Sequence, residues 1–181
     1  MLANHIGVNV LVFTPQGDLI IPVRSKKVSY APLELAASIS GAVTANDVSQ
    51  GRPIQEHVII REGLEELGIK RNEIIEESIQ FLGLTRELLR GGKPEIFFVL
   101  QTKLSYYQIV ERWKQAEDRW ESTKLLKFSF GKFANQQPLE KDRQEFEELM
   151  VSFFQEFGSN MSLPFITNIA LWMKAKRSFC E

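Results

Sequence analysis

The sequence predicts an α/β fold: an α/β/α sandwich around a mixed sheet, with two additional C-terminal helices. Three observations lead to this expectation. Short strand-like runs alternate with turn signals in the first half of the chain, one amphipathic helical pattern interrupts them, and the pattern beyond Pro138 is purely helical. There are too few βαβ units for a doubly wound sheet, so we expect helices packed on a mixed sheet.

The size and composition are those of one globular domain with a hydrophobic core. The chain has 181 residues, 44% of them hydrophobic and 25% charged, with a net charge of −1. We expect one domain over residues 1–135 and a helical extension over residues 136–181 packed on it. A charge so close to zero gives no electrostatic basis for binding nucleic acid or a membrane surface.

Cysteine usage and the N-terminal residues concern the cellular compartment. The only cysteine is Cys180, which excludes an intramolecular disulfide and a two-cysteine zinc site. The first residues have neither the charged region nor the cleavage site of a signal peptide. No apolar run approaches the roughly 18–20 residues of a membrane span. We therefore expect a cytoplasmic protein.

The first elements form a predicted hairpin followed by a third strand. Residues 8–14 are apolar and β-branched, residues 15–18 supply a turn, and residues 19–24 continue as a second strand. Residues 35–43 form a third extended run. The polar segment 44–52 that follows has no regular pattern.

A helix is predicted next, opened by Pro53 and ended by Gly68. Proline suits the first turn of a helix because it has no amide hydrogen to lose, and glycine is common just after the last turn. Four residues at helical spacing form the predicted apolar face: Ile54, Val58, Leu64 and Leu67.

The later elements are three strands and three helices. Residues 79–89 and 95–104 are predicted strands joined by residues 90–94, Ser105 caps a helix to about residue 117, and residues 122–130 form a last strand. Residues 163–176 are the final predicted helix. The helix before it has one apolar face, formed by Phe146, Leu149, Met150, Phe153 and Phe157.

The residues that indicate chemistry lie on the helix that ends at Gly68. Glu62, Glu65 and Glu66 are spaced i, i+3 and i+4, which places them on one helical face about 5–6 Å apart. Three like charges repel, and a hard divalent cation with oxygen ligands would compensate them. Arg61 precedes Glu65 by four residues and can stabilise it through hydrogen bonds.

This segment resembles the box of the Nudix hydrolases, G-x5-E-x7-R-E-U-x-E-E-x-G-U, in which U is a bulky aliphatic residue. The matching residues are Gly41, Asp47, Arg61, Glu62, Glu65, Glu66, Gly68 and Ile69. The chain departs from the box in three ways: Asp47 replaces glutamate, thirteen residues rather than seven follow it, and Gly63 occupies the first aliphatic place. The resemblance covers about residues 5–135 and implies a Nudix-like sandwich.

The resemblance also implies roles for individual residues. Glu65 and Glu66 would be ligands of Mg²⁺ or Mn²⁺, and Glu62 would be a further ligand or the base that activates the attacking water. The carbonyl group of Ser40 or Gly41 would complete the shell, to which Asp47 is a further candidate. One more acidic residue is expected near the last strand, where Glu121 is the candidate and Asp118 its rival.

Three basic residues at or near strand ends are candidates for contacting substrate phosphates: Arg24, Arg86 and Lys93. The resemblance implies hydrolysis of a nucleoside diphosphate linked to a second group, X, with a nucleotide sugar as one option. The alternative is a nucleotide-sensing module with this fold and little or no turnover. The sequence leaves open whether the C-terminal helices form a homodimer interface or only cover the sheet.

Overall fold

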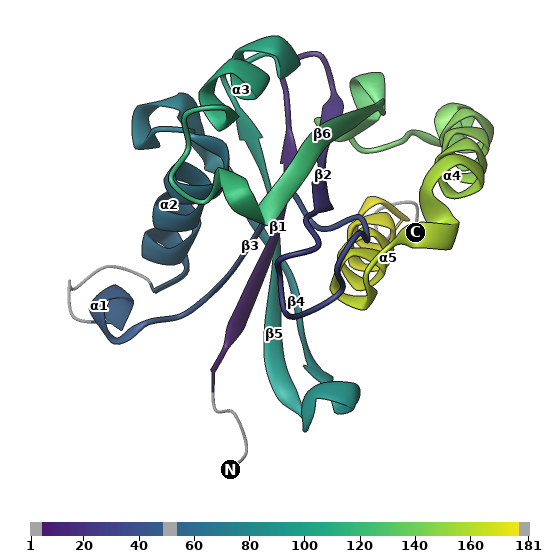
Figure 1. The fold of residues 1–181 in the computed structure, drawn as a ribbon. Helices are drawn as coiled ribbons and strands as arrows, with labels where there is room; N and C mark the ends of the chain where they lie inside the picture. Colours follow the sequence, from purple (N-terminus) through teal and green to yellow (C-terminus); the bar gives the residue numbers. More distant parts are fainter. Residues whose placement is uncertain (1–4, 49–53, 178–181) are drawn as a thin grey trace.

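The computed structural model describes residues 5–48 and 54–177 and shows one mixed sheet between two helical layers (Figure 1). The predicted α/β/α sandwich is therefore confirmed. The strands are β1 (Gly7–Phe13), β2 (Asp18–Arg24), β3 (Ile39–Ala42), β4 (Ile74–Glu87), β5 (Lys93–Thr102) and β6 (Ser122–Ser129). The α-helices are α1 (Ala45–Val48), α2 (Ile54–Leu67), α3 (Tyr106–Trp113), α4 (Arg143–Phe157) and α5 (Leu163–Arg177).

The sheet divides beside β1. The strand order is β4-β5-β1-β2-β6, with β1 and β5 parallel and the other pairs antiparallel. One edge of β1 pairs with β5, and the other edge is shared by two strands. Along that second edge β1 pairs with β3 from Gly7 to Val10 and with β2 only at Phe13. Consequently β2 and β3 diverge from each other, and the candidate site described below lies where they separate.

Strand β1 is buried on both faces because its side chains alternate between two hydrophobic cores. Val8, Val10 and Val12 pack in the core under α2 and α3, whereas Leu11 and Phe13 pack in the core under α4 and α5. The continuous apolar run of this strand reflects burial on both sides. Figure 1 shows the two helical layers on opposite sides of the sheet.

The C-terminal helices cover one face of the sheet. The apolar face predicted for α4 is largely buried: Phe146, Met150, Phe153 and Phe157 are buried and Leu149 is partly buried. Trp172 of α5 packs against Phe13 of β1, with ring centroids 5.2 Å apart. Both helices therefore share a core with β1 and β2.

Most predicted elements agree with the structure, with differences at their ends. The segment 44–52, for which no regular structure was expected, contains α1. β4 begins five residues earlier than predicted, whereas α3 ends at Trp113 rather than near residue 117. Pro53 and Cys180 lie outside the described residues. Leu64 was expected in the buried face of α2 but is 49% exposed, and Ile59 is buried on that helix instead. Within residues 5–48 and 54–177, no helix is long and apolar enough to cross a membrane.

Candidate active site

Helix α2 places two of its glutamates against the backbone of β3. The amide of Ser40 donates to both carboxylate oxygens of Glu66, at 3.3 and 3.2 Å, and the amide of Ala42 donates to Glu62 at 3.3 Å. These two carboxylates therefore lie on the face of α2 that was expected from their spacing, directed at the short strand.

Gly63 stands where the Nudix box has a bulky aliphatic residue, and its contact with β3 explains the difference. A Cβ atom at this position would lie 3.3 Å from Cδ1 of Ile39 in β3. The Cδ1 methyl group of Ile39 would have to shift by a few tenths of an ångström to admit a side chain there. A glycine therefore lets α2 approach β3 closely, and the carboxylates of Glu62 and Glu66 can reach its amides.

Arg61 joins three acidic side chains. Its Nη1 atom lies 3.0 Å from Glu65, the contact expected from their spacing, and 2.9 Å from Glu62. Nε and Nη2 donate to the two carboxylate oxygens of Asp47 at 3.2 and 3.1 Å, and Nη2 also donates to the carbonyl group of Ala42 at 3.0 Å. Arg61 thus ties α2 to α1 and to the end of β3.

Asp47 is buried and its carboxylate is fully engaged. Besides Arg61, the backbone amide and the hydroxyl of Thr44 both donate to its Oδ2 atom at 2.7 Å. Burial opposes ionisation of Asp47, but the hydrogen bonds from Arg61 and Thr44 outweigh it and lower its pKa to about 2. In this conformation the contacts of Asp47 fix Arg61 and the β3–α1 turn.

Three carboxylates form a cluster of negative charge. Burial raises the pKa of Glu66 well above its usual value, and the neighbouring charges of Glu62 and Glu121 raise it further. Burial likewise raises the pKa values of Glu62 and Glu121. Arg24 opposes this effect at Glu66 and Glu121. Glu121, from the short helix Arg119–Glu121, therefore approaches the box residues although it lies 55 positions beyond Glu66.

The oxygen donors suit a hard divalent cation, because Mg²⁺ and Mn²⁺ prefer carboxylate and carbonyl ligands. A buried carboxylate such as Glu66, whose pKa is raised by burial and by the negative charges of Glu62 and Glu121, favours the arrival of positive charge. In the described part of the chain, however, no three acidic, histidine or cysteine side chains converge as a metal-holding group. The contacts to Arg61 explain this in part, because they direct Glu62 and Glu65 toward the guanidinium. The residues fit the cation in chemistry and charge.

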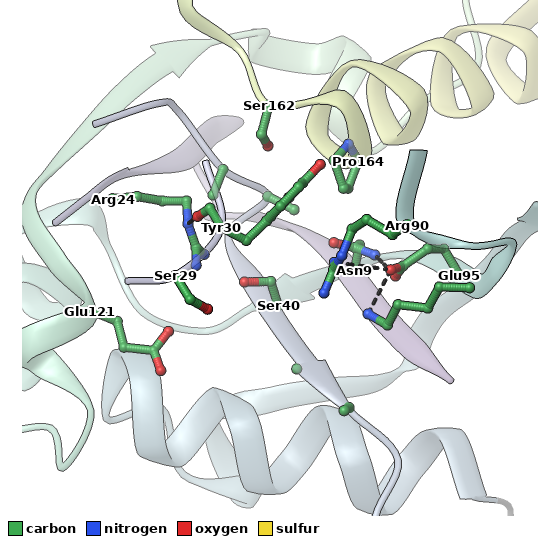
Figure 2. Close-up of a pocket in the computed structure, with 15 residues that line it drawn as sticks. Asn9, Arg24, Ser29, Tyr30, Ser40, Arg90, Glu95, Glu121, Ser162 and Pro164 are labelled. Atoms are coloured by element: carbon green, nitrogen blue, oxygen red, sulfur yellow. Dashed lines mark hydrogen bonds and ion pairs between the residues drawn. The ribbon is translucent and has the colours of Figure 1, made fainter. Parts of the chain in front are cut away.

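A cavity of about 270 Å³ lies where β2 and β3 separate (Figure 2). Glu121 and Arg24 stand at one end, Asn9, Arg90 and Glu95 stand at the other, and Tyr30 lies between them. Its lining residues come from both halves of the chain: Asn9, Arg24, Ser29, Tyr30, Ala36, Ala37, Ser40, Gly41, Ala42, Arg90, Lys93, Glu95, Glu121, Ser162 and Pro164.

Two of the three predicted phosphate-binding residues line this cavity. Arg24 and Lys93 are among its walls, whereas Arg86 is exposed and lines a neighbouring apolar groove of about 310 Å³. Asp118, the rival of Glu121, is not in the wall and accepts a hydrogen bond from Trp120 at 3.0 Å.

Sequence reasoning missed most of the end opposite Glu121. Glu95 is only 2% exposed; Asn9 donates to it at 2.8 Å and Lys93 at 2.6 Å, and Arg90 lies 3.7 Å away. The amide of Asn9 in the middle of an apolar strand was a signal for this network. Tyr30 gave no comparable signal, because a tyrosine in a loop rich in serine and lysine is common.

The comparisons with known proteins establish the fold. No family model matches the chain, and no curated protein matches it. A NUDIX hydrolase from Nitrosomonas europaea shares the fold with a TM-score of 0.54 and 12% identity, over 96% of this chain and 90% of that one. A bifunctional NMN adenylyltransferase/ADP ribose pyrophosphatase from Francisella tularensis, complexed with AMP and a Mn ion, has a TM-score of 0.62 and 13% identity over 97% of this chain.

These matches include the C-terminal helices, since they cover nearly the whole chain. The chain spans only 43% of the length of the bifunctional protein. The fold of residues 5–48 and 54–177 is the Nudix fold, as the box residues had predicted.

Proposed function

We propose that the chain is a metal-dependent hydrolase of the Nudix type, which cleaves the diphosphate bond of a nucleoside diphosphate linked to a group X. The observation that carries this proposal is the position of the cluster of Glu62, Glu66 and Glu121. Glu62 and Glu66 accept hydrogen bonds from amides of β3, and residues of β3 line a cavity that also presents Glu121, Arg24 and Lys93. A negative cluster beside basic groups suits a ligand that brings both a cation and phosphates.

Each residue of the cluster has a proposed role. Glu65 and Glu66, with Glu62 and the carbonyl group of Ser40 or Gly41, would hold Mg²⁺ or Mn²⁺. The cation would neutralise the diphosphate and stabilise charge in the transition state of an in-line displacement. Glu62 and Glu121 are the two candidates for the base that takes a proton from the attacking water. Both are carboxylates of the cluster, and burial raises the pKa of each.

Arg61 and Asp47 support this arrangement without contacting the cavity. Arg61 orients the carboxylates of Glu62 and Glu65, and Asp47 orients Arg61. Arg24, 3.0 Å from the carbonyl group of Tyr30, would contact the phosphates directly. Lys93, which donates to Glu95 at 2.6 Å, would meet them only where the diphosphate joins X. Arg86 in the adjacent groove would act on a more distant part of a substrate.

The end of the cavity around Glu95 favours an uncharged, hydroxyl-bearing group as X. Lys93 and Arg90 contribute two positive charges there, and Glu95 contributes one negative charge. A second negative charge comes from Glu87, which lines the adjacent groove and lies 3.5 Å from Arg90. A charge-balanced wall with many donors and acceptors suits hydroxyl groups better than an anion or an apolar group. A nucleotide sugar is therefore the substrate class that we favour.

The decisive experiment is a screen of nucleoside diphosphate derivatives with Mg²⁺ and Mn²⁺, followed by Glu66→Gln on the best substrate. We expect Glu66→Gln to lower kcat by at least about a hundredfold with the fold intact, because the cation loses a charged ligand. The control is Glu111→Gln, which changes an exposed glutamate on α3. Wild-type activity in Glu66→Gln would remove this assignment of α2.

A nucleotide-sensing module is the second candidate. The pairing of Glu62 and Glu65 with Arg61, and the engagement of Asp47 away from the cavity, favour it. Tight nucleotide binding without turnover of any compound in the screen would support this candidate over the hydrolase.

A further inference from the structure

The loop between β2 and β3 carries Tyr30 into the cavity and has an unusual backbone. Ala31 has a φ of 48° and Leu33 a φ of 68°, both in the left-handed region that favours glycine. Such a conformation persists only where the surrounding structure fixes it.

The segment between α4 and α5 supplies these contacts. Nδ2 of Asn160 donates to the carbonyl group of Leu33 at 3.0 Å, and the carbonyl group of Asn160 accepts from the amide of Leu35 at 2.8 Å. The amide of Ser162 donates to the carbonyl group of Leu35 at 2.9 Å. Asn160 thus binds the loop with its side chain and its backbone, on both sides of Glu34.

Tyr30 crosses from this loop to the turn between β4 and β5. Its hydroxyl donates to Glu87 at 2.7 Å, and the guanidinium of Arg90 lies 4.4 Å from the centre of its ring. Glu87 is only 6% exposed. Figure 2 shows Tyr30 in the middle of the cavity, with Arg24 on one side and Arg90 and Pro164 on the other.

We propose that Tyr30 is the residue that determines which groups X the cavity accepts, and that Asn160 is a positioning residue that fixes Tyr30 there. The inference rests on the proposed function and goes beyond it. Arg90 occupies the space between the Tyr30 ring and Glu95, so X ends against the Tyr30–Arg90 pair, which limits X to one sugar ring. The C-terminal part of the chain thereby contributes to selectivity.

The contacts explain why Tyr30 is effective in this role. Tyr30 is held at its hydroxyl by Glu87, at its ring by Arg90 and at its backbone carbonyl group by Arg24, so it cannot move aside without breaking several interactions. Removing only the hydroxyl of Tyr30 takes away its hydrogen bond to Glu87, and the buried carboxylate of Glu87 then keeps only the ion pair with Arg90 at 3.5 Å among these contacts. Tyr30→Phe therefore weakens the attachment while keeping the ring.

The test compares hydrolysis of nucleoside diphosphates whose X is one ring, ADP-ribose and UDP-glucose, with hydrolysis of NAD, whose X adds a second ring. We expect Tyr30→Ala to reduce the ratio of kcat/KM between one-ring and two-ring substrates at least tenfold, mainly through KM. Tyr30→Phe and Asn160→Ala should change the ratio in the same direction by about threefold or more. Ser159→Ala, which alters the exposed neighbour of Asn160, should leave it unchanged.

Amide hydrogen exchange separates positioning from a general loss of stability. Asn160→Ala should accelerate exchange of the Leu33 amide, which donates to the carbonyl group of Arg24, and leave the amides of β1 unchanged. A changed ratio without faster exchange would overturn the role of Asn160. An unchanged ratio in Tyr30→Ala would overturn the role of Tyr30.

Failure of the proposed function has a different signature. If the wild type hydrolyses none of these compounds, that function is lost, and the same ratio is then measured as dissociation constants in the presence of Mn²⁺. A ratio of affinities that falls in Tyr30→Ala would retain the selectivity role in a binding module. If the wild type neither hydrolyses nor binds the compounds, both proposals are overturned.

Discussion

Gly41 lies directly beneath the carboxylate of Glu62, so closely that a Cβ atom at position 41 would overlap its Oε1 atom. Any side chain at this position would displace Glu62 from the amide of Ala42. The glycine of the box is therefore required here by contact with the carboxylate. Its backbone conformation is not the reason, because Gly41 is not among the residues with positive φ.

Gly41→Ala should consequently impair catalysis more than folding. We expect kcat to fall at least about tenfold because the displaced Glu62 is a proposed ligand or base, with a small change in melting temperature because position 41 is partly exposed. Kinetic assays and thermal melts of the same preparations check this. Gly92→Ala is a control glycine with no atom near its missing side chain, although its φ of 78° adds strain. Full activity in Gly41→Ala would contradict the close approach.

Asp47→Asn should test whether this residue acts through Arg61. The substitution keeps the shape but removes the charge that receives Nε and Nη2 of Arg61. We expect a loss of about 1–3 kcal/mol in the free energy of unfolding, because the guanidinium loses a charged, buried partner. Urea unfolding measures it. A direct metal role for Asp47 predicts another result: weakened Mn²⁺ binding with unchanged stability.

The fold could be predicted from the sequence because its signals are local. Apolar alternation, turn residues and the capping serine of α3 each act over a few residues, and the structure retains them. The box residues were predicted for the same reason, since Arg61 and Glu65 meet through helical spacing alone.

The residues that were missed depend on contacts between distant segments. Leu64 has helical spacing with Val58 and Leu67, but Gly63 and Ile59 face the strands and Leu64 turns outward. Arg86 was expected near the phosphates, but Arg90 lines the cavity instead. No local pattern reveals which arginine faces the cavity, because β4 shifts its register twice against β5.

The C-terminal core should be essential for stability. Phe153 is fully buried and contacts the rings of Phe128, Phe130 and Phe157. We expect Phe153→Ala to lower the free energy of unfolding by about 3–5 kcal/mol, through lost burial and the cavity left behind. Phe154→Ala, on the 37% exposed neighbour, should lose less than half as much. Equal losses from the two variants in urea unfolding would contradict the packing of α4.

Lys176 provides a prediction about pH. Its ammonium group is buried and donates to the carbonyl groups of Ala134 and Gln136 at 3.4 and 2.9 Å, and no carboxylate of residues 5–48 or 54–177 pairs with it. Burial lowers its pKa from 10.5 to about 8. Between these two values the unfolded chain binds more protons at this site than the folded chain. The contribution of Lys176 to the free energy of unfolding therefore rises with pH from about 8 to 10.5.

Lys176→Met should remove this rise. The variant also loses two hydrogen bonds, but that loss is independent of pH, so the test is the slope and not the level of stability. Urea unfolding at pH 7, 8, 9 and 10 should show the wild type gaining stability relative to Lys176→Met above about pH 8. Lys124→Met, on an exposed residue of β6, should run parallel to the wild type. A constant difference between wild type and Lys176→Met at all four pH values would mean that Lys176 stays charged in the folded protein.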